Sequence, residues 1–101
     1  MRSLIYLASV GLTILAIGCQ QRHFATDACI NNLRQIDGAK QQWMLEQHKT
    51  TNDVPTWDDL RDYIGQSGTT GPVLTCPAGG TYTIGRVGEK PTCSIARHRL
   101  P

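Results

Sequence analysis

The chain has 101 residues, and its ten lysines and arginines against eight aspartates and glutamates leave a formal net charge of only +2. This length gives room for one domain, and a near-neutral chain without a basic stripe or a block of like charges argues against nucleic acid as a partner. A domain this small is only marginally stable, so we expect the four cysteines to help hold it together.

The chain begins with a short positive start and an apolar run. Arg2 precedes residues 4–18 (LIYLASVGLTILAIG), which carry no charge. A membrane-spanning helix needs about 20 apolar residues and the core of a signal peptide about 7–15, so the run fits a signal peptide better. An uncleaved single-pass anchor is the alternative. Residues 1–18 are therefore predicted to be a signal peptide or membrane anchor, and either would tether the following domain to a membrane.

Residues 16–19 (AIGC) resemble the lipobox of bacterial lipoproteins, in which a small residue precedes an invariant cysteine. The leucine usual three residues before the cysteine is Ala16 here. The resemblance implies that Cys19 is lipidated on sulfur and becomes the new N-terminus, with residues 19–25 as a tether. Two or three acyl chains would anchor it stably, because each buried CH₂ contributes about 0.8 kcal/mol. Ordinary cleavage and a pilin-like anchor remain as further alternatives.

Apolar residues recur at helical spacing from residue 26 onward. The stripe consists of Cys29, Leu33, Ile36, Ala39 and Trp43. Spacings of three and four residues predict an amphipathic helix of about 20 residues with one buried face. Thr26 or Asp27 is the predicted N-cap, and the polar residues 48–53 are predicted to end the helix in a loop.

A second, shorter helix is predicted after Pro55. Thr56 is its N-cap candidate, and Gly65 is placed to end it in a left-handed conformation. Four carboxylates gather in this region: Asp53, Asp58, Asp59 and Asp62. They lack the order of a calcium-binding loop, and the favourable position of acidic residues at a helix start explains two of them without a ligand.

The last third is predicted to form a small antiparallel sheet. A turn-rich linker, residues 66–72, precedes three short β-type runs at residues 73–76, 81–84 and 92–95. A sheet of two or three short strands is unstable alone and must pack on the long helix. The predicted fold class is therefore α+β, with one domain spanning residues 26–101.

The cysteines in this domain suggest a disulfide. Cys76 and Cys93 flank the same hairpin region and are the expected pair, and closing a loop of that size contributes about 3 kcal/mol. Cys29 would then be a buried thiol on the helix stripe. The rival pairing joins Cys29 to Cys76 or to Cys93.

Metal and catalytic chemistry are not expected. There is no C-x-x-C, so the zinc-knuckle and thioredoxin-type patterns are missing. Cys76, Cys93 and His98 form a partial ligand set whose spacing matches no common metal site. His23, His48 and His98 lie in no nucleophile motif. We therefore predict no metal, no cofactor and no enzymatic activity.

Two segments resemble bacterial type II secretion pseudopilins and related prepilin-like proteins. Residues 28–37 (ACINNLRQID) are similar to a stretch of their long N-terminal helix, and residues 76–82 (CPAGGTY), with 91–94 (PTCS) and His98, are similar to the C-terminal part of a subgroup. The resemblance implies a pilin-like head, a helix spine with a small antiparallel sheet packed on it. It also implies a partner role in or near a secretion or pilus-like assembly.

The N-terminus departs from this family. Prepilins carry a Gly-Phe-type cleavage site and a glutamate in the mature apolar helix, whereas residues 4–18 contain neither. The hypothesis is therefore a non-enzymatic protein of the bacterial cell envelope, with a pseudopilin-type head on a lipoprotein-type anchor. Its domain would lie on the periplasmic or extracytoplasmic side, with secretion-system or pilin-like subunits as partners. The alternative is a free-standing envelope lipoprotein with a structural or ligand-binding role.

Overall fold

The computed structural model describes the backbone of residues 2–65 and 71–101 and the side chains of residues 23–65 and 71–101. Within these ranges the element order is α1 (Arg2–Glu46), α2 (Trp57–Ile64), β1 (Tyr82–Thr83) and β2 (Thr92–Cys93). The two strands pair antiparallel, with Tyr82 opposite Cys93. The predicted α+β class is confirmed.

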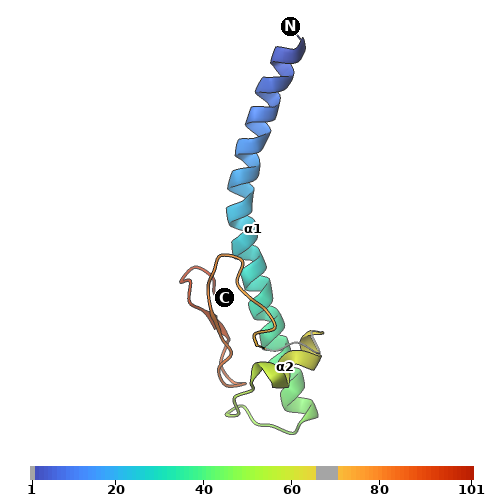
Figure 1. Ribbon diagram of the computed structural model, residues 1–101. Helices are drawn as coiled ribbons and strands as arrows, with labels where there is room; N and C mark the ends of the chain where they lie inside the picture. Colours follow the sequence, from blue (N-terminus) through green and yellow to red (C-terminus); the bar gives the residue numbers. More distant parts are fainter. Residues whose placement is uncertain (1, 66–70) are drawn as a thin grey trace.

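α1 is a single helix of 45 residues. At 1.5 Å per residue it should be about 68 Å long, which accounts for the 70 Å long axis of the molecule. Figure 1 shows the rest of the chain gathered around its C-terminal half, while its N-terminal half projects away. The predicted helix start at Thr26 or Asp27 is wrong, since both residues lie inside α1. Residues 19–25 (CQQRHFA) contain no glycine or proline that would interrupt the helix.

The predictions made for the N-terminus fall on side chains outside the described ranges. These are the apolar run of residues 4–18 and the lipidation of Cys19. In the part of the chain with described side chains, no helix is long and apolar enough to span a membrane.

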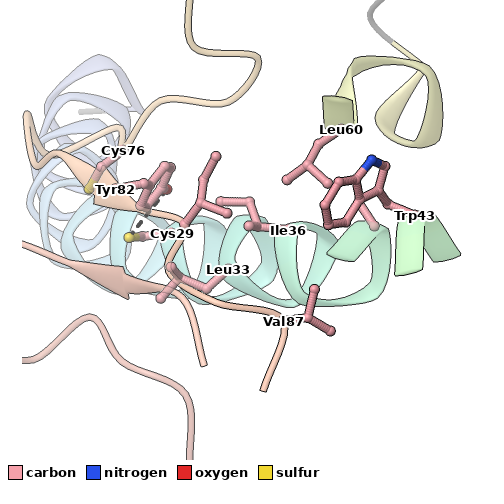
Figure 2. Packing of buried hydrophobic residues seen from close by; sticks show 10 residues of the cluster. Cys29, Leu33, Ile36, Trp43, Leu60, Cys76, Tyr82 and Val87 are labelled. Atoms are coloured by element: carbon pink, nitrogen blue, oxygen red, sulfur yellow. Dashed lines mark hydrogen bonds between the residues drawn. The ribbon is translucent and has the colours of Figure 1, made fainter. Parts of the chain in front are cut away.

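The core lies along the predicted stripe of α1. Cys29, Leu33 and Ile36 are fully buried, and Trp43 is nearly so. α2 adds Leu60, and the last third of the chain covers the stripe with Cys76, Tyr82, Ile84 and Val87. Figure 2 labels all of these side chains except that of Ile84 and shows the labelled ones gathered along α1. The sequence periodicity therefore identified the buried face correctly.

α2 begins and ends as predicted. The backbone N–H of Asp59 donates to Thr56 Oγ1 at 3.2 Å, and the backbone N–H of Thr56 donates to Asp59 Oδ2 at 2.8 Å, which completes a capping box. Gly65 ends the helix with a φ of 78°, a conformation that glycine adopts without the strain of a Cβ.

The segment of residues 73–76 is not a strand, so the prediction of a β-run there is wrong. Gly71, just before it, has a φ of 78°, and residues 73 and 74 form a bend, so the backbone turns where a strand would have to be extended. Its carbonyl at Thr75 accepts a hydrogen bond from Asn32 Nδ2 on α1 at 3.1 Å. This segment is therefore held by α1. Residues 66–70 of the predicted linker lie outside the described residues.

A buried lysine holds the loop between β1 and β2 to α1. Lys40 is completely buried, and its Nζ donates to the carbonyl oxygen of Ile84 at 2.5 Å and to that of Glu89 at 2.6 Å. Burial lowers the pKa of Lys40, against the opposing effect of the Asp37 and Glu89 carboxylates. The sequence pattern did not identify Lys40, whose partners lie more than 40 positions away.

Candidate metal centre

Four potential ligand side chains meet where the C-terminal third packs on α1. Cys29 comes from α1, Cys76 from the segment before β1, Cys93 from β2 and His98 from the tail. Their ligand atoms all lie within 4.8 Å of one another. Cys29, Cys76 and His98 are buried and Cys93 is partly buried, so the cluster is largely shielded from water.

The turn after Cys76 brings the chain close to the cluster. The backbone N–H of Gly79 donates to the carbonyl of Cys76 at 3.0 Å, and Gly79 has a φ of 86°. At Gly80, an added Cβ would lie 2.6 Å from Cys93 Sγ and 3.1 Å from the Ile95 side chain. Glycine at position 80 therefore lets the turn pass directly beside the sulfur of Cys93.

Cys29 is supported by a short chain of hydrogen bonds. The Tyr82 hydroxyl donates to Cys29 Sγ at 3.4 Å, as Figure 2 shows, and accepts a hydrogen bond from Asn32 Nδ2 at 3.1 Å. Burial raises the pKa of the Cys29 thiol, and the Tyr82 hydrogen bond only partly offsets this effect. Asn32 and Tyr82 therefore orient a donor toward a sulfur that burial alone would keep protonated.

Cys76 has the opposite balance. Burial favours its neutral thiol, but hydrogen bonds from the backbone of Ala78, from Cys29 and from the backbone of Gly80 bring the pKa of Cys76 below its ordinary value. The turn thus directs backbone dipoles at this sulfur and favours the thiolate, which is the form that binds metals.

His98 is held at both ring nitrogens. Nδ1 lies 3.4 Å from Cys76 Sγ, and Nε2 lies 3.3 Å from Thr26 Oγ1 on α1. If Nε2 carries the proton and donates to Thr26, the lone pair of Nδ1 faces the sulfurs. The imidazole is therefore oriented to act as a ligand through Nδ1.

The cluster contains Cys76, Cys93 and His98, the partial ligand set noted in the sequence, together with Cys29. Cys29 is fully buried. Cys76 and Cys93 are free thiols in the structure and are not bonded to each other, so their disulfide stays a prediction. Sequence reasoning left Cys29 out because its position on the apolar stripe already explained it as a core residue.

Three of the four carboxylates of the acidic region, those of Asp53, Asp58 and Asp59, have structural partners instead. Asp59 caps α2, Asp58 Oδ1 lies 2.9 Å from Arg61 Nη2, and Asp53 Oδ2 accepts the backbone N–H of Thr50 at 2.7 Å. Asp53 thereby closes the loop after α1, and the Thr50 backbone hydrogen bond holds the pKa of its carboxyl below the ordinary value. These contacts agree with the electrostatic interpretation of the acidic residues.

The other two histidines, His23 and His48, lie outside the cluster. His23 is exposed on α1, and His48 is exposed just after it, with a φ of 54°. Both lie apart from the three sulfurs. His98 is therefore the histidine that the fold brings to the cysteines.

Comparisons of this chain with protein-family models, with curated proteins and with solved structures found no match.

Proposed function

We propose that the protein is a membrane-tethered, non-enzymatic subunit of the bacterial cell envelope with a pseudopilin-like head, which contributes to a secretion or pilus-like assembly. The observation that carries this proposal is the continuity of α1. Residues 19–25, which would follow directly from a lipid anchor at Cys19, lie in the same helix as the core of the head, with no break between the two.

The shape of the molecule supports an interaction role. The head packs on the C-terminal half of α1, and the N-terminal half extends beyond it (Figure 1). Cleavage before Cys19 would remove residues 1–18, and the remaining helical residues 19–25 would still join the lipid anchor rigidly to the head. A domain on a loose tether would instead be free to rotate. The rigid junction favours a subunit that is held in a fixed orientation.

The head itself supports a structural role. Cys29, Cys76 and His98, which are among its most reactive side chains, are buried against α1. A nucleophile or general base must reach its substrate, and burial of these groups among core residues suits stabilisation of the head better than turnover of a substrate.

Phe24 and Leu45 provide a matched test of the interaction surface. Both are large apolar side chains on α1, with 73% and 71% of their surface exposed. Phe24 lies near the point where the helix leaves the head, and Leu45 lies at its opposite end. A photo-crosslinking amino acid would be placed at each position in turn in the full chain and activated in intact cells.

An assembly subunit should cross-link through position 24 to a second copy or to pilin-like and secretion subunits, and much less through position 45. Mass spectrometry of the adducts would identify the partners. A free-standing lipoprotein, the alternative function, would give the tethered monomer alone at both positions, and that result would overturn the assembly proposal.

A further inference from the structure

We propose that Cys29, Cys76, Cys93 and His98 bind one zinc ion in a closed tetrahedral site that fastens the C-terminal third of the chain to α1. The inference rests on the geometry of these side chains and is independent of the membrane tether and of any assembly partner.

The donor set suits zinc. Three thiolates and one imidazole form one of the ligand combinations common in structural zinc sites. Soft sulfur donors disfavour magnesium and calcium, which take oxygen ligands. A disulfide between any two of the cysteines would leave the third sulfur and the imidazole of His98 without a role, whereas a single ion uses all four.

The spacing also suits zinc. With Zn–S bonds of about 2.3 Å, two sulfurs at adjacent corners of a tetrahedron are about 3.8 Å apart. The four ligand atoms lie within 4.8 Å of one another, and Cys76 Sγ is already 3.4 Å from His98 Nδ1. Shifts of the order of an ångström therefore bring all four atoms onto one ion.

The neighbouring groups are those that a zinc site needs. Thr26 Oγ1 lies 3.3 Å from His98 Nε2, so it can accept that N–H and leave Nδ1 for the metal. Tyr82 donates to Cys29 Sγ, and Gly80 leaves space beside Cys93 Sγ. The first two contacts orient His98 and Cys29 before any ion arrives, and the missing Cβ at Gly80 leaves room for Cys93.

The charge balance can be written out. Zinc binding releases the protons of the cysteine thiols, so Zn²⁺ with three thiolates and a neutral imidazole carries a net charge of −1. The Tyr82 hydroxyl faces Cys29, and the backbone of the turn after Cys76 supplies further donors to its sulfur. These dipoles are directed at the sulfurs, where the excess negative charge resides.

The consequence is a metal-dependent head. β1 and β2 contribute only two residues each to the sheet, and a sheet of that size is not stable by itself. One ion would join α1, the turn at Cys76, β2 and the tail. Because the ion binds the folded chain and the unfolded chain lacks the assembled site, binding free energy becomes folding stability.

The test uses the full chain, extracted in mild detergent and kept reduced. Metal content would be measured by mass spectrometry for the wild type, for Cys76→Ser, and for His98→Asn. His48→Asn is the matched control, because His48 is exposed, lies outside the cluster and occupies a left-handed conformation that asparagine tolerates. We expect about one zinc per chain in the wild type and the control, and at least tenfold weaker retention against a chelator in the other two variants.

X-ray absorption on the zinc-loaded wild type keeps the test decisive if a variant fails to fold. Three sulfur neighbours and one nitrogen neighbour are expected. The proposal is overturned if the reduced wild type retains no zinc, if the ion has mainly oxygen ligands, or if His48→Asn loses zinc as readily as His98→Asn.

Discussion

Replacing Lys40 by methionine tests how the loop between β1 and β2 is held to α1. The side chain is completely buried, and its ammonium group donates to the carbonyls of Ile84 and Glu89. Methionine has a similar length and flexibility but cannot donate a hydrogen bond, so Lys40→Met removes both bonds while keeping most of the packing.

The expected cost follows from the two carbonyls. Leaving a buried acceptor without its donor costs about 1–3 kcal/mol. The hydrogen bond to the Ile84 carbonyl is buried and the one to the Glu89 carbonyl is partly buried. The loss of the first should therefore cost the whole of this free energy and the loss of the second only part of it. Methionine also avoids the desolvation of a buried charge. Because this relief offsets part of the loss, we expect Lys40→Met to lower the free energy of unfolding by about 1–3 kcal/mol, a large share of the roughly 5–15 kcal/mol typical of a folded domain.

Urea unfolding of the full chain measures this change when it is followed by tryptophan fluorescence, to which the buried Trp43 and the partly buried Trp57 both contribute. Lys90→Met is the matched control, since Lys90 is exposed and also donates to a backbone carbonyl, that of Pro101. It should change stability by less than about 0.5 kcal/mol. Equal stability of the Lys40 and Lys90 variants would refute the structural role assigned to Lys40.

Three further predictions concern single positions. Gly38→Ala should stabilise the protein by up to about 1 kcal/mol in thermal unfolding, because position 38 lies inside α1 and an added Cβ meets no atom within 4 Å; a loss of stability would contradict this. Gly80→Ala should lower zinc affinity at least tenfold in a chelator competition, because its Cβ would displace Cys93 Sγ, while Gly38→Ala should bind zinc as the wild type does. Asp53→Asn should be less stable than the wild type at neutral pH, and the difference should shrink as the pH falls below the ordinary carboxyl value of 3.8. The sign follows because the pKa of Asp53 is lower in the folded than in the unfolded protein, so its carboxylate stabilises the fold above pH 3.8 and stops doing so once it is protonated. A stability difference that did not change with pH in acid denaturation would contradict this prediction.

The parts of the fold that the sequence predicted are those that local interactions decide. The buried stripe on α1 follows from helical periodicity, and the capping box at Thr56 and the left-handed Gly65 follow from short-range backbone geometry. The apparent strand at residues 73–76 was misjudged because its β-type residues lie where the chain bends after Gly71, and the sheet pairs only β1 with β2 in the described part of the chain.

The junction at residues 19–25 was misjudged for a different reason. Thr26 has the chemistry of an N-cap, and its position after a polar stretch suggested a helix start. In the structure it lies inside α1, and its hydroxyl meets His98. A side chain with two suitable roles cannot be assigned from local sequence when its partner is 72 positions away.

The candidate metal site could be predicted only in part. Cys76, Cys93 and His98 are close enough in sequence to be considered together, but their spacing fits no common motif. Cys29 reaches them only because the turn after Cys76 packs on α1. The same long-range packing buries Lys40, so both features depend on tertiary structure and leave no periodic signal.

The most direct test of the account is the native mass of the protein released gently from bacterial membranes, without added metal or reductant. We predict a chain that begins at Cys19, carries acyl groups and retains one zinc ion, with the zinc and not the acyl groups lost in Cys76→Ser. A metal-free chain lighter by two hydrogens would show a disulfide in place of the zinc site, and an unacylated chain would contradict the lipoprotein-type tether.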